Sequence, residues 1–150
     1  MISDEDIKKR LSKLDFSCNK CSNCCRYEPG SVYITKKDLD NLSSFLNLSK
    51  NEFVKQCCRV VMKDEKMVLA LLEKINYDCI FWNNGCIVYE KRPLQCVTYP
   101  YWVILVENGD YWEHEKRRCS GIDKKGSLSV EEKFKFYIDE KNSEYFVIRD

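Results

Sequence analysis

The segment Cys18-Asn-Lys-Cys21-Ser-Asn-Cys24-Cys25 places four cysteines within eight residues. Two successive C-x₂-C gaps let the backbone turn three sulfur atoms toward one centre, and bacterial ferredoxins hold an iron–sulfur cluster with such a run. A single C-x₂-C pair would instead suit a zinc site that a distant pair completes. Adjacent side chains rarely reach one small ion together, so either Cys24 or Cys25 is expected at a second site or as a packed or reactive thiol.

Four further cysteines follow at longer intervals: Cys79, Cys86, Cys96 and Cys119. Cys79 and Cys86 flank Asn83-Asn84-Gly85, so a hairpin turning there would bring the two together near its base as ligands. Cys96 is expected in a proline-flanked loop, and Cys119 after a last hairpin. A metal that joins distant cysteines closes long loops, where it constrains the unfolded chain most.

The composition favours metal ligation over disulfides. The chain has 150 residues, ten of them cysteine, and 25 Lys plus Arg against 24 Asp plus Glu. A formal charge of +1 offers no field for nucleic acid or a membrane surface, so neither partner is expected. The sequence contains neither a secretory signal pattern nor a membrane-spanning apolar run, so the expected compartment is the cytoplasm, where thiols stay reduced.

Helix starts are predicted where a serine or threonine precedes an acidic residue by three positions. Such pairs predict helices after Ser3, Thr35, Ser49 and Ser129, the first ending near Asp15. Each start is followed by apolar residues at helical spacing: Ile7, Leu11 and Leu14; Leu39, Leu42, Phe45 and Leu46; Phe53 and Cys57; Val130, Phe134, Tyr137 and Ile138.

Short β-segments are predicted between these helices. Residues 31–34 read as a strand, and residues 60–71 as a hairpin turning at 63–66. Residues 80–89 and 102–115 read as hairpins around Asn-Gly pairs, which supply the positive φ of tight turns. The sequence therefore predicts one α+β domain over residues 1–150, stapled by metal, with terminal helices, short hairpins and a cysteine-rich loop.

The chain resembles the YkgJ-type cysteine-cluster proteins, which carry the CxxCxxCC zinc- or iron-chelating domain. The matching pieces are residues 16–25, 79–86, 92–100 and 119–122. The order and spacing of the cysteines, with Arg92-Pro93 before Cys96, carry the resemblance. Ser22 stands where the family usually has glycine. The eight cysteines of this pattern, here called the motif cysteines, are the candidate metal ligands: Cys18, Cys21, Cys24, Cys25, Cys79, Cys86, Cys96 and Cys119.

Three functions are compatible with these ligands. The leading interpretation is a cytoplasmic protein that holds an iron–sulfur cluster, expected as [4Fe–4S], with a redox or electron-transfer role and a protein or redox partner that the sequence does not identify. The alternatives are a zinc-stabilised binding module and a metal-delivery protein, neither with catalytic activity. Whether the protein is an enzyme stays open, because no substrate site or catalytic residue is identifiable.

Most of the remaining candidate donors are expected to be structural. Cys57 and Cys58 lie outside the family pattern, on the third predicted helix, and are expected in the core because free cysteine is among the most buried residue types. His114, the single histidine, is expected on a solvated strand face between Glu113 and Glu115. Arg92 is compatible with two roles, donation to a carboxylate or a ligand phosphate, or fixing the loop that carries Cys96. Most of the aromatic side chains are expected to lie in the core.

Overall fold

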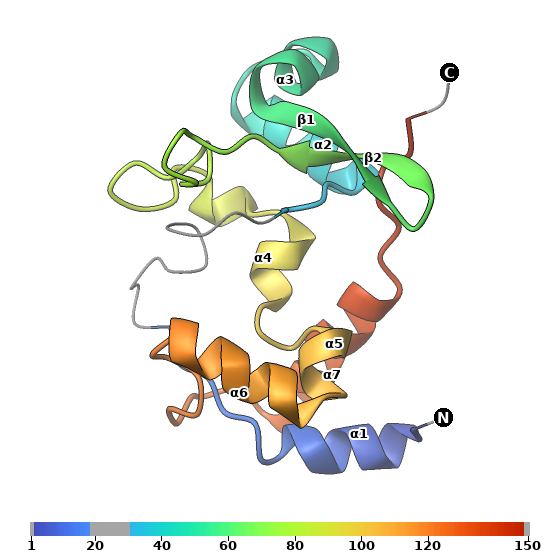
Figure 1. Ribbon diagram of the computed structural model, residues 1–150, viewed down its shortest axis with the longest axis vertical. Coiled ribbons are helices and arrows are strands. Elements are labelled where there is room, and N and C mark those ends of the chain that lie inside the picture. Colours follow the sequence, from blue (N-terminus) through green and yellow to red (C-terminus); the bar gives the residue numbers. More distant parts are fainter. Residues whose placement is uncertain (1, 19–30, 149–150) are drawn as a thin grey trace. The chain divides into compact units, whose positions relative to one another are not determined.

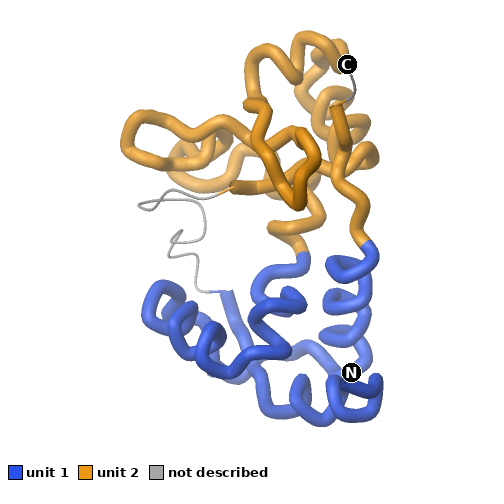
Figure 2. Tube along the Cα trace, turned by 45° about the vertical axis from the view of Figure 1, so that its right-hand side comes forward, with its two compact units in different colours: residues 1–24, 98–142 blue, residues 25–97, 143–150 orange. Residues whose placement is uncertain are grey.

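The computed structural model describes residues 2–18 and 31–148 and divides the chain into two compact units (Figure 2). Unit 1 is drawn from residues 1–24 and 98–142, and unit 2 from residues 25–97 and 143–150. Helices and one antiparallel hairpin make up the regular structure (Figure 1), so the predicted α+β class is confirmed. Within the part of the chain that the structure describes, no helix is long and apolar enough to cross a bilayer.

Unit 1 is helical. Its elements are α1 (Asp4–Leu11), α5 (Val103–Val106), α6 (Gly109–Arg118) and α7 (Val130–Lys141). The most buried side chains of its core are Ile7, Leu11, Tyr101, Leu105, Val106, Trp112, Ile122 and Tyr137. The predicted caps are present, since the Ser3 hydroxyl accepts from the Asp6 N–H and Ser129 forms a reciprocal capping box with Glu132.

Helix α1 ends at Leu11, earlier than the predicted Asp15. After the C-cap Ser12, the amides of Lys13 and Leu14 bond carbonyls three residues back, which tightens the chain out of the α-helix. The Leu11 carbonyl, left at the helix end, accepts from the buried Lys133 ammonium at 3.1 Å. The lysine charge therefore lies where the negative end of the helix dipole favours it.

The hairpin predicted over residues 102–115 is wrong, because this segment forms α5 and α6. The Asn108 side-chain oxygen accepts from the N–H groups of Asp110 and Tyr111, at 3.0 and 3.3 Å. Asparagine is favoured both in tight turns and at helix N-caps, and here it begins a helix. His114 therefore lies on a helix and not a strand, although it is exposed as expected.

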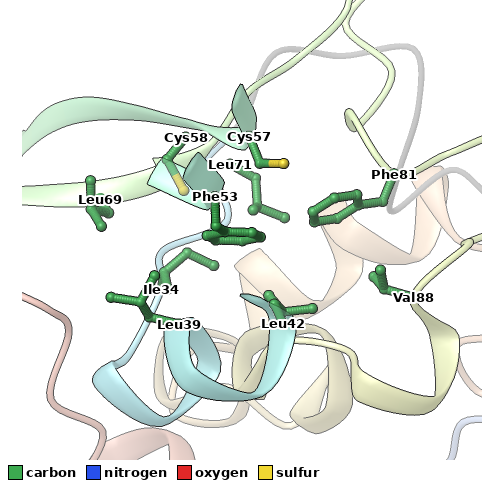
Figure 3. Packing of buried hydrophobic residues seen from close by; sticks show 10 residues of the cluster. All are labelled: Ile34, Leu39, Leu42, Phe53, Cys57, Cys58, Leu69, Leu71, Phe81 and Val88. Carbon is green, nitrogen blue, oxygen red and sulfur yellow. The ribbon is translucent and has the colours of Figure 1, made fainter. Parts of the chain in front are cut away.

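Unit 2 combines helices with the hairpin. Its elements are α2 (Lys36–Phe45), α3 (Lys50–Cys57), β1 (Cys58–Lys63), β2 (Lys66–Leu71) and the 3₁₀ turn η1 (Tyr89–Lys91), after which α4 (Leu94–Thr98) leads out of the unit. Capping boxes at Thr35 and Ser49 begin α2 and α3 as predicted. The core of the unit is shown in Figure 3: Ile34, Leu39, Leu42, Phe53, Cys57, Cys58, Leu69, Leu71, Phe81 and Val88.

One predicted core residue of α2 is exposed. Leu39 and Leu42 are buried, whereas Phe45 is 43% exposed. Leu46 packs partly against the core, and Phe45, about 100° away around the helix, lies on the more exposed side.

The β1–β2 hairpin confirms the prediction for residues 60–71. Val61 pairs with Val68, and the turn runs through Asp64 and Glu65, both at positive φ. The predicted strand at residues 31–34 is reduced to a single bridge from Tyr33 to Ala70. Cys58 begins β1, so Cys57 and Cys58 do not share the predicted helix, because the backbone becomes extended at Cys58.

The hairpin predicted over residues 80–89 is reduced to an isolated bridge, although its turn residues are correct. Asn84 and Gly85 have φ of 55° and 130°, and only an isolated bridge joins Trp82 to Cys86. The preceding segment instead pairs backward along the chain, since Cys79 bridges Glu73 and the Ile80 N–H bonds Leu72. Cys79 and Cys86 are therefore not partners across a hairpin.

Candidate metal centre

The motif cysteines fall into three groups. Cys21, Cys24 and Cys25 lie outside the described residues. Cys18 is exposed, and Cys119, the C-cap of α6, is 7% exposed. The others are half-buried: Cys79, Cys86 and Cys96. Cys96 lies within α4 rather than in the predicted loop, and Cys119 follows a helix rather than a hairpin.

The chain that leads into Cys18 is fixed to the chain that follows Cys119. The Ser17 N–H donates to the Gly121 carbonyl at 3.0 Å, and the Asp123 N–H donates to Asp15 at 2.8 Å. An antiparallel bridge joins Phe16 to Ile122 between these two bonds. The pairing sets the segment ending at Cys18 beside the segment starting at Cys119, within unit 1.

Glycine is required for this pairing. A Cβ atom added at Gly121 would lie 2.3 Å from the Ser17 carbonyl oxygen, and one added at Gly126 would lie 2.2 Å from that of Phe16. Both obstacles are backbone atoms, which cannot rotate away as the tip of a side chain could. The two glycines thus permit the close backbone approach that positions residues 16 and 17.

Side chains of unit 1 hold both of the paired segments. The Tyr101 hydroxyl donates to the Leu14 carbonyl at 3.1 Å, and the Lys133 ammonium pairs with the Asp15 carboxylate at 3.0 Å. On the other side, the Trp112 indole N–H donates to the Asp123 carboxylate at 3.1 Å. The approach to Cys18 is therefore over-determined by backbone and side-chain bonds.

On the far side of the cysteine-rich segment, the chain is fixed beside Cys96. The Gln95 amide donates to the Ser31 carbonyl at 2.8 Å and accepts from the Tyr33 N–H at 3.0 Å. One half-buried amide thus satisfies two backbone groups of the segment that leaves the cysteine run. Gln95 precedes Cys96 directly, so the structure ties this second end to another motif cysteine, within unit 2.

Helix α4, which carries Gln95 and Cys96, is itself held by Asp38. One carboxylate oxygen accepts from the Leu94 N–H at 3.1 Å, and the other accepts from the Thr35 N–H at 3.1 Å. Burial raises the pKa of Asp38, while the hydrogen bonds from Thr35 and Leu94 oppose that rise. The buried carboxyl joins the start of α4 to the start of α2.

Arg59 links residue 31 to the surroundings of Cys79. Its guanidinium donates to the Ser31 hydroxyl and to the Glu73 carboxylate, each at 3.1 Å. Glu73 is bridged to Cys79 through the backbone. The start of the segment after the cysteine run and the chain at Cys79 are therefore connected through one arginine.

Cys79 and Cys86 pack against the core that contains Cys57 and Cys58. Burial raises the pKa of the Cys57 thiol, and burial with the neighbouring Cys57 raises that of Cys58 to about 12. Both therefore remain protonated thiols at neutral pH, and each is 8% exposed. The prediction that these two cysteines lie in the core is confirmed.

Cys119 lies beside a buried polar network. The Tyr99 hydroxyl donates to the Glu115 carboxylate, which also pairs with Arg118 at 3.4 Å. Burial raises the pKa of Tyr99, as do its hydrogen bond to Glu115 and the charge and hydrogen bond of the Cys119 side chain. The Tyr99 ring packs edge-on against Phe16 and Trp102, with centroids 5.9 and 5.1 Å apart.

The donor chemistry of the site is that of thiolates. Among residues 2–18 and 31–148, no three Cys, His, Asp or Glu side chains are grouped to hold a metal ion, and three motif cysteines lie outside these ranges. The described motif cysteines lie at or beside fixed backbone, and sulfur donors suit zinc and iron–sulfur clusters. The residues present therefore fit a thiolate-bound metal.

Several positioning residues were not predicted: Asp38, Arg59, Gln95, Glu115 and Gly121. Gln95 and Gly121 each lie within two residues of a motif cysteine and inside the pieces that match the family pattern, which are the signals the sequence offers for them. Arg92, by contrast, plays the structural one of its two predicted roles. It donates to the Tyr89 carbonyl at 3.0 Å and stacks over the Tyr89 ring at 4.0 Å, which fixes the turn before α4.

Comparisons with known proteins agree with this donor set. A family model named CxxCxxCC and described as "Putative zinc- or iron-chelating domain" matches residues 17–126. Uncharacterized protein MJ0661 of Methanocaldococcus jannaschii is 29% identical over 135 residues, covering 84% of this chain and 68% of the relative. Uncharacterized protein MJ0939 of the same organism is 28% identical over 122 residues, covering 77% of this chain and only 40% of the relative. No solved structure matches the chain significantly.

Proposed function

Since this chain belongs to the CxxCxxCC family of zinc- or iron-chelating domains, we propose that it binds an iron–sulfur cluster, of the [4Fe–4S] type, through its motif cysteines. The proposed ligands are drawn from Cys18, Cys21, Cys24, Cys25, Cys79, Cys86, Cys96 and Cys119. Eight thiolates suffice for two four-sulfur sites, or for one cluster with spare reactive thiols. The C-x₂-C-x₂-C run favours an iron–sulfur cluster, because a single zinc ion needs only one C-x₂-C pair and a second, distant pair of ligands.

The observation that carries this proposal is the anchoring of both ends of the cysteine-rich segment. One end is bonded to the chain that follows Cys119, and the other end is bonded to Gln95 beside Cys96. Hydrogen bonds that fix the residues flanking a ligand segment lower the conformational entropy those flanking residues lose on ligation.

The roles of this chain's own residues follow from their surroundings. The motif cysteines supply the anionic sulfur donors, which must lose their protons on ligation. Phe16, Tyr99 and Trp102 pack into an aromatic group beside Cys119 and limit the access of water there. A bound cluster supplies one-electron redox chemistry, with a potential set by burial and by hydrogen bonds to sulfur.

We further propose that residues 1–150 act as one metal-binding domain, since the family match over 17–126 includes parts of both units. The proposed setting is the cytoplasm, where thiolates stay available, and the proposed partner is a redox protein rather than nucleic acid or a membrane. The formal charge of +1 supports the exclusion of polyanionic partners.

The test is anaerobic purification followed by iron, zinc and acid-labile sulfide analysis with a visible spectrum. We expect iron and sulfide in equal amounts and a broad absorbance that dithionite bleaches. Stoichiometric zinc without sulfide, retained after reconstitution with iron and sulfide, would overturn the cluster and leave a thiolate zinc site. Protein that holds neither metal would overturn the proposal altogether.

A further inference from the structure

An apolar groove in unit 2 is lined by none of the described motif cysteines. The groove lies between α2, α3, β2 and the last described residues of the chain, and its volume is about 450 Å³. Its apolar lining consists of Leu39, Val54, Leu69, Phe146 and Ile148. Sites that bind ligands in proteins commonly have volumes of about 300–1,000 Å³, so the groove is large enough to hold one.

Backbone pairing holds one wall of the groove in place. The Ile148 N–H donates to the Met67 carbonyl at 2.8 Å, and an antiparallel bridge joins Val68 to Val147. The last described residues therefore run beside β2 (Figure 1). Because side chains alternate between the two faces of a strand, Phe146 and Ile148 lie on the same face as Leu69. This wall is formed before any ligand arrives.

Apolar surface continues from the groove onto the β1–β2 hairpin. Val60 pairs with Leu69, and Met62 pairs with Met67, so all four side chains lie on the face that lines the groove. Val60, Met62 and Met67 are 49%, 65% and 42% exposed. Single exposed apolar residues are ordinary, whereas several that adjoin an apolar groove indicate an interaction site. Methionine suits such a site because its flexible side chain adapts to a partner.

The rim of the groove is positively charged. Of the described residues that line it, three are basic, Lys36, Lys50 and Lys55, and one is acidic, Asp40. The Lys50 ammonium lies 2.8 Å from the Asp40 carboxylate, so these two charges offset each other. Lys36 and Lys55 are exposed, and neither forms an ion pair within residues 2–18 and 31–148. Two positive charges are therefore available to a bound partner.

We propose that the groove and the adjoining hairpin face bind an acidic amphipathic segment of a partner protein. The apolar side chains of the segment fill the groove and cover Met62 and Met67, while its carboxylates face Lys36 and Lys55. Amphipathic helices are recognised in this way by apolar grooves of other proteins. A small apolar acid would fill the groove but leave the hairpin face exposed, so the continuous surface favours a peptide. The inference is independent of the bound metal.

The test measures binding of a fluorescein-labelled peptide to the anaerobically purified full chain by fluorescence anisotropy. The peptide is an amphipathic helix of about four turns, with leucine at every third or fourth position and glutamate elsewhere. A second peptide carries lysine in place of glutamate. We expect saturable binding of the glutamate peptide that weakens as salt is raised, and at least about tenfold weaker binding of the lysine peptide.

Reversing the charge of the rim tests the role of the lysines. We expect Lys36→Glu combined with Lys55→Glu to weaken binding of the glutamate peptide about tenfold, because attraction becomes repulsion. The control combines Lys37→Glu with Lys124→Glu, at exposed positions outside the groove lining, and changes the net charge equally. All four lysines are exposed, so the folded core is retained in both variants.

A polar substitution within the groove tests its apolar character. Val54 is half-buried in the groove lining, and we expect Val54→Gln to weaken binding at least about fivefold, because apolar contact area is lost. Ile104→Gln is the control, since Ile104 is a 55% exposed apolar residue of unit 1, and we expect it to leave binding unchanged. Circular dichroism of each variant checks the fold.

Three outcomes would overturn the inference. The first is no saturable binding of the glutamate peptide, or equal binding by wild type and the rim variant. The second is binding of decanoate that depends on Lys36 and Lys55 without peptide binding, which would assign the groove to a free apolar acid. The third is a dimer, seen by sedimentation, that Val54→Gln dissociates, which would assign the surface to a second copy of the chain. Metal analysis of the same preparation reports on the proposed function separately.

Discussion

Ser17 donates its backbone N–H to the carbonyl of Gly121 at 3.0 Å, which joins the residue before Cys18 to the second residue after Cys119. The bond closes a loop of about a hundred residues, and such long-range closures are entropically costly in the unfolded chain. A metal that takes both neighbouring cysteines would stabilise the same closure. Backbone pairing and metal ligation would therefore hold the same two segments together.

Replacing Gly121 by alanine tests the importance of this contact. The added Cβ would lie 2.3 Å from the Ser17 carbonyl oxygen, so the segment before Cys18 and the segment after Cys119 must separate. We expect the free energy of unfolding of the metal-free protein to fall by about 1–3 kcal/mol, and metal retention to fall with it. Urea unfolding and chelator competition measure the two effects.

Gly109 is the matched control for this substitution. An added Cβ meets no atom within 4 Å there, and the residue begins α6 with ordinary backbone angles. Gly109→Ala should stabilise the protein by about 0.4–1 kcal/mol, because alanine restricts the unfolded chain. Equal effects of the two alanines would show that the close approach of Gly121 to Ser17 does not matter.

Gln95→Glu tests the second anchored end. The carboxylate can still accept from the Tyr33 N–H, but it cannot donate to the Ser31 carbonyl, which it would face at about hydrogen-bond distance. We expect a loss of about 1–3 kcal/mol in the free energy of unfolding and faster metal release. Gln56→Glu, at an exposed position of α3, should change stability by less than about 0.5 kcal/mol. Metal release unchanged by Gln95→Glu would argue against any role for this end.

Comparing Cys119→Ala with Cys57→Ala distinguishes a proposed metal ligand from a cysteine that only packs in the core. The two residues are almost equally buried, at 7% and 8% exposed, so each truncation should cost about 1 kcal/mol in metal-free protein. Only Cys119→Ala should lower the metal content, because Cys57 is expected to be a packing residue. Metal analysis of both proteins, purified in parallel, checks this difference. Equal losses of metal would place Cys57 among the ligands.

Alkaline pH should unfold the protein partly through Cys58. Its pKa is raised to about 12 in the folded protein by burial and by Cys57, whereas an unfolded thiol titrates near its ordinary value of 9.0. Between these values the unfolded state has lost a proton that the folded state keeps, so stability falls as pH rises. The buried tyrosines Tyr99, Tyr101 and Tyr137, whose pKa values are also raised, act in the same direction.

Cys58→Ala isolates this contribution. The decline in the free energy of unfolding between about pH 9 and about pH 11, measured by urea titration under reducing conditions, should be shallower in the variant than in wild type. Parallel declines in the two proteins would mean that Cys58 is not protonated preferentially in the folded state.

Local patterns predicted the parts of the fold that depend on neighbouring residues. The caps at Ser3, Thr35, Ser49 and Ser129 mark real helix starts, because cap bonds span only three residues. Asn108 led to a wrong prediction of a hairpin, since asparagine is favoured both in tight turns and at helix N-termini. Whether Asn108 begins a helix or a turn depends on the tertiary packing of the segment that follows, where Trp112 of α6 packs into the core.

The site was predicted as a set of ligand types and not as an arrangement. Cysteine spacing is visible in the sequence, and so is the burial expected of Cys57 and Cys58. The bonds that fix the surroundings, such as Gln95 to Ser31 and Tyr99 to Glu115, join residues far apart in the chain. No local pattern encodes such pairs, because they depend on the tertiary fold.

X-ray absorption at the metal edge of the anaerobically purified protein tests the central claim most directly. We expect a first shell of sulfur only, four atoms at about 2.3 Å, supplied by thiolates and, in a cluster, also by inorganic sulfide. For iron, an additional iron–iron shell should identify the cluster. A first shell dominated by nitrogen or oxygen would contradict thiolate ligation by the motif cysteines.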